Sequence, residues 1–179
     1  MLFRSLAIGY QAGYAYQGTG TGAIAIGYQA GYSLSPTTNG TIAIGRSSLR
    51  NATGADNFAI GYESGASMTS GAGNYLEGYR SGYSLTTGSY NLAIGYQSLL
   101  SATSTSYNTA IGYQALRFYT GSYSTAIGYY ALRNATGAAN FAIGYYAGAA
   151  ITNGTYNTLI GDGTLQNYNR TGKIGRAHV

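Results

Sequence analysis

The stretch Asn140-Phe141-Ala142-Ile143-Gly144-Tyr145-Tyr146-Ala147 contains the tetrapeptide Ala-Ile-Gly-Tyr, which recurs with small changes along the chain. The glycine of each copy marks one repeat, and successive markers are 16 to 18 residues apart. The ten markers are Gly9, Gly27, Gly45, Gly61, Gly78, Gly95, Gly112, Gly128, Gly144 and Gly161. A period this short, without helical spacing of apolar residues, is typical of a solenoid in which each repeat stacks on the last. We therefore predict an all-β fold, a parallel β-solenoid or β-roll of about ten coils, with two short strands in each coil.

An isoleucine precedes the marker glycine in nine of the ten repeats. A β-branched residue at a fixed position suits a buried strand, so we predict that this column points into the core. The column consists of Ile8, Ile26, Ile44, Ile60, Ile94, Ile111, Ile127, Ile143 and Ile160. The fifth repeat has Glu77 instead, a costly residue in a core unless a cation such as Arg46 or Arg80 pairs with it. We interpret Glu77 as sequence drift or a local opening of the coil, not as a site.

An asparagine lies four residues before the marker in six repeats. Stacked coils would place these amides one above another at the strand spacing of about 4.8 Å, close enough to hydrogen-bond as a ladder. The predicted asparagine ladder consists of Asn57, Asn74, Asn91, Asn108, Asn140 and Asn157.

A tyrosine follows the marker in eight repeats. Side chains alternate along a strand, so the tyrosines should share the face of the isoleucines, but the intervening glycine can bend the strand and reverse that assignment. The column is therefore either part of the core or a binding face. Its members are Tyr10, Tyr28, Tyr62, Tyr79, Tyr96, Tyr113, Tyr129 and Tyr145.

The other face of the strand should carry the alanine two residues before the marker and the marker glycine itself. A surface of such small residues would allow a second chain to approach closely, which predicts lateral packing of identical copies. A further glycine lies seven residues before most markers, as at Gly54 and Gly88, where it suits a corner that needs a positive φ.

The composition argues against catalysis. The chain has no cysteine, one histidine and four acidic residues at unlike repeat positions, so it offers no catalytic residues, no metal ligands and no cofactor site. Its net charge of +5 comes from scattered cations, with Arg50, Arg117 and Arg133 sharing one repeat position. That scatter does not favour a nucleic-acid partner, and no apolar run is long enough to insert in a membrane.

The end of the sequence departs from the repeat. Residues 174–179, Ile-Gly-Arg-Ala-His-Val, match no repeat position and resemble the translation of a short-read sequencing adapter. We expect residues 1–173 to form a single solenoid that belongs to a longer repetitive protein, and residues 174–179, which include His178, to be a non-native tail.

The segment from Asn108 to Leu116, Asn-Thr-Ala-Ile-Gly-Tyr-Gln-Ala-Leu, carries a family resemblance. Ala-Ile-Gly followed three residues on by Ala or Ser resembles the head repeats of trimeric autotransporter adhesins, and the longer form is similar to repeats of phage tail fibres and related surface fibres. The resemblance implies a left-handed β-roll, often trimeric, that is displayed on a cell or virion and used for attachment. The repeat here is longer than the coil of the adhesin heads.

We therefore expect a non-catalytic extracellular fibre or adhesin segment that partners with identical chains and binds a surface glycan or protein. One alternative is a self-assembling filament in which subunits stack head to tail. A second is an ice-binding solenoid, which needs threonines in regular columns on a flat side, whereas the threonines here gather mainly in turns.

Overall fold

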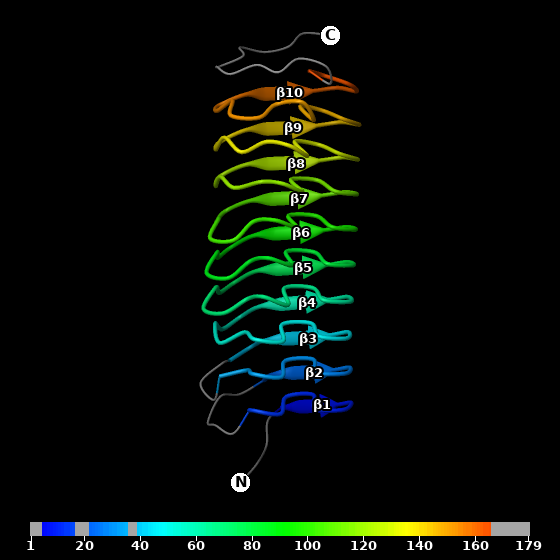
Figure 1. The fold of residues 1–179 in the computed structure, drawn as a ribbon, viewed down its shortest axis with the longest axis vertical. Helices are drawn as coiled ribbons and strands as arrows, with labels where there is room; N and C mark the ends of the chain where they lie inside the picture. Colours follow the sequence, from blue (N-terminus) through cyan, green and yellow to red (C-terminus); the bar gives the residue numbers. More distant parts are fainter. Residues whose placement is uncertain (1–4, 17–21, 36–38, 166–179) are drawn as a thin grey trace.

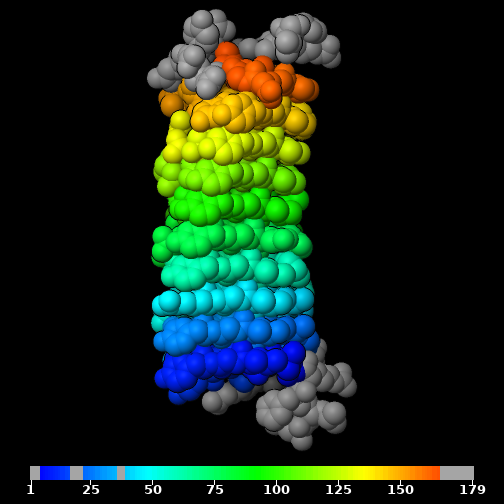
Figure 2. All heavy atoms as spheres, turned by 90° about the vertical axis from the view of Figure 1, so that its right-hand side faces the viewer, coloured from blue at the N-terminus to red at the C-terminus, as the bar shows by residue number. Residues whose placement is uncertain are grey.

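The computed structural model describes residues 5–16, 22–35 and 39–165. Ten parallel strands form one sheet in sequence order, and successive coils stack into a straight shaft (Figures 1 and 2). The strands are β1 Leu6–Ile8, β2 Ile24–Ile26, β3 Ile42–Ile44, β4 Phe58–Ile60, β5 Tyr75–Glu77, β6 Leu92–Ile94, β7 Thr109–Ile111, β8 Thr125–Ile127, β9 Phe141–Ile143 and β10 Thr158–Ile160. The all-β parallel solenoid predicted from the repeat is confirmed. Within the described residues each coil has one three-residue strand, so the prediction of two strands per coil was wrong.

The marker glycines are required by two separate features of the stack. Their φ angles lie between 117° and 137°, a region that residues with a side chain rarely adopt. Their backbones also touch the next coil, since a Cβ on Gly78 would lie 2.5 Å from the carbonyl oxygen of Gly95. Any larger residue at the marker would therefore strain its own coil and push the neighbouring coil away.

The residues two and four positions after the marker are left-handed in every described coil. Gln97 has a φ of 53° and Leu99 a φ of 51°, although neither is glycine. Hydrogen bonds between coils hold these conformations in place, as where the Gln97 amide donates to the Tyr79 carbonyl at 2.8 Å. The left-handed residues are thus a regular part of the turn after the strand.

The corner glycines that precede the strand have a different role from the one predicted. Gly54, Gly71, Gly88, Gly121 and Gly137 do not have a positive φ. They are small because the next coil lies against them, and a Cβ on Gly54 would approach the carbonyl carbon of Gly71 to 2.7 Å. The positive φ at this corner belongs instead to the residue two positions later, such as Asp56 or Tyr90.

The strands are oriented the opposite way from the one that the sequence predicts. From β2 to β10 the middle residue of each strand is buried, and in eight of the ten coils the residue at this position is an alanine. From β2 to β9 the isoleucines are half-buried on the outer surface, and Ile8 and Ile160 are 53% and 54% exposed. The prediction of an isoleucine core was therefore wrong for Ile8, Ile26, Ile44, Ile60, Ile94, Ile111, Ile127, Ile143 and Ile160. The expected outer face of alanine and glycine was wrong for the same reason, because the alanines form the core.

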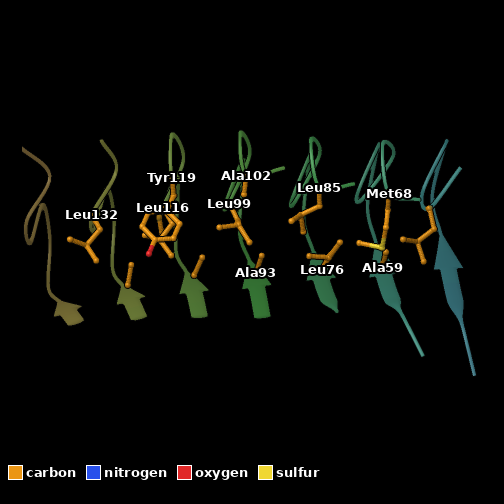
Figure 3. Close-up of a cluster of buried hydrophobic side chains, with 14 of the residues drawn as sticks. Ala59, Met68, Leu76, Leu85, Ala93, Leu99, Ala102, Leu116, Tyr119 and Leu132 are labelled. Carbon is orange, nitrogen blue, oxygen red and sulfur yellow. The ribbon is translucent and has the colours of Figure 1, made fainter. Parts of the chain in front are cut away.

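The core of each coil is filled by residues whose volumes compensate one another (Figure 3). A glycine four residues after the marker is followed three residues later by a large side chain, as in Gly31 and Leu34, whereas a leucine there is followed by alanine, as in Leu49 and Ala52, except in the seventh coil. A Cβ on Gly31 would lie 2.7 Å from Leu34 Cδ1, so both positions compete for one space. The inner strand residue must be small because little room is left beside this pair.

This compensation predicts strong coupling between Gly31 and Leu34. Gly31→Leu alone should overpack the second coil and Leu34→Ala alone should leave a cavity, each lowering the free energy of unfolding by about 2 kcal/mol or more. Together the two substitutions recreate the pattern of Leu49 and Ala52, so the double variant should recover most of the loss. Urea unfolding of the four proteins measures the coupling, and strictly additive losses would contradict the shared space.

Candidate interaction surfaces

The outer side of the sheet presents a continuous apolar surface, which we call the Ile–Tyr face. It consists of three columns, at three positions before, one before and one after each marker glycine. The first column is apolar or threonine, as in Ile24, Phe58 and Thr109, and the second is isoleucine in every strand except β5. In β5 the outward Glu77 accepts a hydrogen bond from the Tyr75 hydroxyl at 3.1 Å. Because this column faces outward, Glu77 needs no cation, and Arg80 pairs with Glu63 instead.

The tyrosine column lies on the surface, which decides between the two alternatives left by the sequence. Its side chains are exposed or, at Tyr62, half-buried, and neighbouring rings stack with centroids 4.9 to 5.4 Å apart. Arg46 continues the stack where tyrosine is missing, with its guanidinium 5.6 Å from the Tyr28 ring and 5.5 Å from the Tyr62 ring. The stack therefore runs without a gap from Tyr10 to Tyr145. Its members are Tyr10, Tyr28, Tyr62, Tyr79, Tyr96, Tyr113, Tyr129 and Tyr145.

Stacking determines what the tyrosines can offer to a ligand. Each ring face is covered by the ring above or below, so the stack presents ring edges and hydroxyl groups about 5 Å apart. The eighth and ninth coils add a second tyrosine, and Tyr130 packs against Tyr129 with centroids 4.2 Å apart. A hydrogen bond with Tyr130 raises the pKa of Tyr129 to about 12.

The column two positions after the marker is polar and pairs between neighbouring coils. Gln29 donates to Gln11 at 2.8 Å, and Gln114 donates to Gln97 at 3.0 Å. The Arg80 guanidinium bonds to the Glu63 carboxylate at 2.7 Å, and this is the one ion pair between described residues. The side chains in this column are acids, bases and amides that pair between neighbouring coils. Which of them pair determines the net charge along this edge of the shaft.

The predicted asparagine ladder is present and buried. The side-chain amides of Asn74, Asn91 and Asn108 each donate to the side-chain oxygen of the asparagine in the preceding coil at 3.0 Å. Asn157 bonds to Asn140 in the same way at 2.8 Å. Ser124 replaces asparagine between these two runs, and its hydroxyl accepts the backbone N–H of Asn140 at 2.9 Å. The ladder is Asn57, Asn74, Asn91, Asn108, Asn140 and Asn157, and it satisfies polar groups inside the shaft instead of offering them to a ligand.

Tyr119 occupies the space that opens where the ladder lacks asparagine. It is fully buried, and its hydroxyl bonds to Ser124 Oγ and donates to the Ser122 carbonyl at 3.0 Å. The seventh coil can therefore hold Tyr119 together with Leu116, whereas the coils of Leu49, Leu99 and Leu132 have alanine three residues after the leucine. Burial raises the pKa of the Tyr119 phenol to about 12, an effect that the Ser124 hydrogen bond opposes.

The raised pKa of Tyr119 predicts a loss of stability at high pH. The unfolded phenol gives up its proton near pH 10, whereas the folded one keeps it to about pH 12. The contribution of Tyr119 to the free energy of unfolding is therefore constant below pH 10 and declines from there to pH 12. Between pH 9 and pH 11 the wild type should lose about 1 kcal/mol more of its unfolding free energy than Tyr119→Phe, since the two proteins differ only at this side chain. Urea unfolding at the two pH values checks this, and parallel pH profiles would contradict it.

Other kinds of site find little support in the part of the chain that the structure describes. No group of three or more His, Cys, Asp or Glu side chains there could hold a metal ion, and no helix there is long and apolar enough to cross a membrane. A hollow of about 240 Å³ lies beside β1 between Leu6, Gly13 and Leu34, with an apolar lining. Residues 174–179, with His178, lie outside the described residues.

No family model, curated protein or solved structure matches this chain. The hypothesis of an adhesin-like or fibre-like protein therefore depends on the repeat motif. The surface chemistry of the solenoid is the other source of information about its function.

Proposed function

We propose that this solenoid is a non-catalytic segment of an extracellular fibre or adhesin, and that identical chains assemble side by side through the Ile–Tyr face. The observation that supports this proposal is the outward direction of the isoleucine columns. Ile26, Ile44 and Ile94 belong to a column that spans ten in-register strands, about 43 Å from the first strand to the last at the usual strand spacing, and that is apolar in every strand except β5, which has Glu77. Soluble monomers rarely expose a contiguous apolar surface of that length.

The regularity of the face favours a second copy of the same chain over an unrelated partner. Every strand pairs with the next without a shift, so equivalent side chains form straight columns. Straight columns of one residue type are self-complementary, since a copy that meets them presents the same spacing. The face also has few charges, and Glu77 is the one acidic residue in the isoleucine column. Three copies around one axis would cover the isoleucine column in the manner that the resemblance implies, and the tyrosine column would lie at the rim of each contact.

The tyrosine stack supports an attachment role along the edge of the sheet. Its hydroxyl groups recur about 5 Å apart over much of the shaft, which suits an extended polymer with its own repeat better than a compact ligand. A surface glycan has many hydroxyl partners for such a strip. The rigid shaft would then serve both to extend the molecule and to bind along its length.

The ice-binding alternative is less well supported by the arrangement of threonines. Thr53, Thr69, Thr86 and Thr103 do form a column, but it lies at a corner of the coil and not on the sheet. The hydroxyls of the first three donate to carbonyls of the next coil at 3.1 to 3.2 Å, so they are not available to donate hydrogen bonds to an external partner.

Lysine substitutions in alternate coils of the face test the lateral assembly. Ile60→Lys, Ile94→Lys and Ile127→Lys together should raise the dissociation constant of the assembly by about a hundredfold or more, because charges would be buried between copies. Alternate coils avoid stacking the new charges on one another. The measurement is sedimentation equilibrium, with circular dichroism to check that the fold is kept.

A matched control carries the same charge in the same region of the shaft. Thr53→Lys, Thr86→Lys and Thr120→Lys lie at the corner that precedes the same three strands, away from the Ile–Tyr face. This variant should assemble like the wild type. A wild type that remains monomeric at high concentration, or two triple variants that dissociate equally, would reject side-by-side assembly through this face.

A further inference from the structure

Two arginines of neighbouring coils converge on one amide. Arg117 Nη1 donates to Gln114 Oε1 at 3.2 Å, and Arg133 Nε donates to the same oxygen at 2.9 Å. Both guanidinium groups also lie against the ring of Phe118, at 4.7 and 5.1 Å from its centroid. Gln114 is only 5% exposed, so the oxygen that holds the two arginines is fixed in place.

The charge of this cluster is not neutralised within the described residues. The single ion pair there joins Arg80 to Glu63, and the other described acids, Asp56, Glu77 and Asp162, form no ion pair with either arginine. Arg117 Nε is buried and has no hydrogen-bond partner in the described structure. Two positive groups that share one neutral acceptor repel each other, and an external anion between them would remove that cost.

The chain itself provides a comparison for this arrangement. Glu63 and Gln114 occupy the same repeat position, two residues after the marker. At Glu63 one carboxylate meets one arginine, whereas at Gln114 a neutral amide meets two arginines. The amide oxygen has two lone pairs and both are used, so the remaining guanidinium N–H groups need other acceptors.

We propose that Gln114, Arg117, Phe118 and Arg133 form a binding site for an oxyanion, the carboxylate or sulfate group of an acidic glycan. A pair of planar guanidinium groups matches the oxygen geometry of either anion. Phe118, which is 39% exposed, adds an apolar surface on which the carbon skeleton of a sugar can rest. The choice of a glycan rests on the proposed attachment role, whereas the choice of an anion rests on the arginine geometry alone.

Among residues 5–16, 22–35 and 39–165, only two cations gather at this site, which favours a single oxyanion over a nucleic-acid backbone. Arg50 shares the repeat position of Arg117 and Arg133 but lies four coils below Arg117, where it packs over the Tyr32 ring at 5.9 Å. A phosphate backbone would need a longer row of cations than the site provides.

The test is isothermal titration calorimetry of the full chain with short oligosaccharides at low salt. The probes are a heparin hexasaccharide for sulfate, a hyaluronan hexasaccharide for carboxylate, maltohexaose as the neutral sugar and a single-stranded hexanucleotide. Wild type should bind at least one acidic sugar and bind it about tenfold or more tightly than maltohexaose. No preference for an acidic sugar would overturn the site, and tighter binding of the hexanucleotide would overturn the glycan as carrier.

Gln114→Glu is the decisive variant because it nearly preserves shape and supplies the missing carboxylate internally. It should weaken acidic-sugar binding about tenfold or more, and the thermal midpoint should be kept, because pairing with two arginines offsets the loss of the hydrogen bond that Gln114 donates to Gln97. Gln11→Glu is the control, since it makes the same change of charge at the same repeat position, where Gln11 accepts a hydrogen bond from Gln29 and no described arginine contacts it. Equal weakening by both variants would show that binding follows net charge and would overturn the site.

A second variant and a second measurement separate this inference from the proposed assembly. Arg133→Gln should weaken acidic-sugar binding as Gln114→Glu does, and unchanged binding would count against the site. Neither residue belongs to the Ile–Tyr face, so both variants should sediment like the wild type. If the lysine variant assembles like the wild type while Arg133→Gln loses acidic-sugar binding, the assembly proposal alone fails. If the lysine variant loses assembly while Arg133→Gln binds the sugar like the wild type, the binding site alone fails.

Discussion

Backbone contact between successive marker glycines is the constraint on which the rest of the solenoid depends. The carbonyl oxygen of Gly95 lies where a Cβ of Gly78 would be, and the same contact recurs from coil to coil. Coils that approach this closely must stack in register, since a shift of one residue would place a side chain in the contact. Register in turn aligns the asparagines into a ladder and the tyrosines into a stack. One glycine per coil thus organises both the interior and the surface.

Narrow coils also decide which residues lie inside. The inward strand residue is alanine in eight coils, and leucine fits only where glycines leave room, as at Leu76 between Gly65 and Gly82. The larger isoleucines are left for the outer side. An apolar outer side is unfavourable in water, and the same narrowness that excludes isoleucine from the core therefore creates a surface suited to contact with other molecules.

The sequence was sufficient to predict the features that depend on periodicity alone. These are the all-β stack, the position of the coils and the asparagine ladder. Periodicity could not give the direction of the strands, because alanine and isoleucine alternate and either could face inward. Hydrophobicity favoured Ile94 over Ala93, whereas space in the coil requires Ala93. The compensation between Gly31 and Leu34, or between Leu49 and Ala52, was visible in the sequence and could have identified which columns share the core.

The arginine site was not predictable from the repeat because it arises where the repeat is broken. Two coils depart strongly from the common pattern. In the fifth coil the departures compensate one another, since Leu76 fills space beside glycines and Glu77 accepts a bond from Tyr75.

In the seventh coil the core departure is also compensated, because the Tyr119 hydroxyl reaches Ser124, but the surface departure is not. Phe118 and two arginines meet there around a neutral amide, and the backbone N–H of Phe118 donates to the Arg133 carbonyl at 3.0 Å, which fixes the two coils against each other. The repeated columns look much the same in every coil. The cluster with uncompensated positive charge, in contrast, occurs at one position along the shaft. A ligand that binds at one point along the shaft would therefore bind at this cluster.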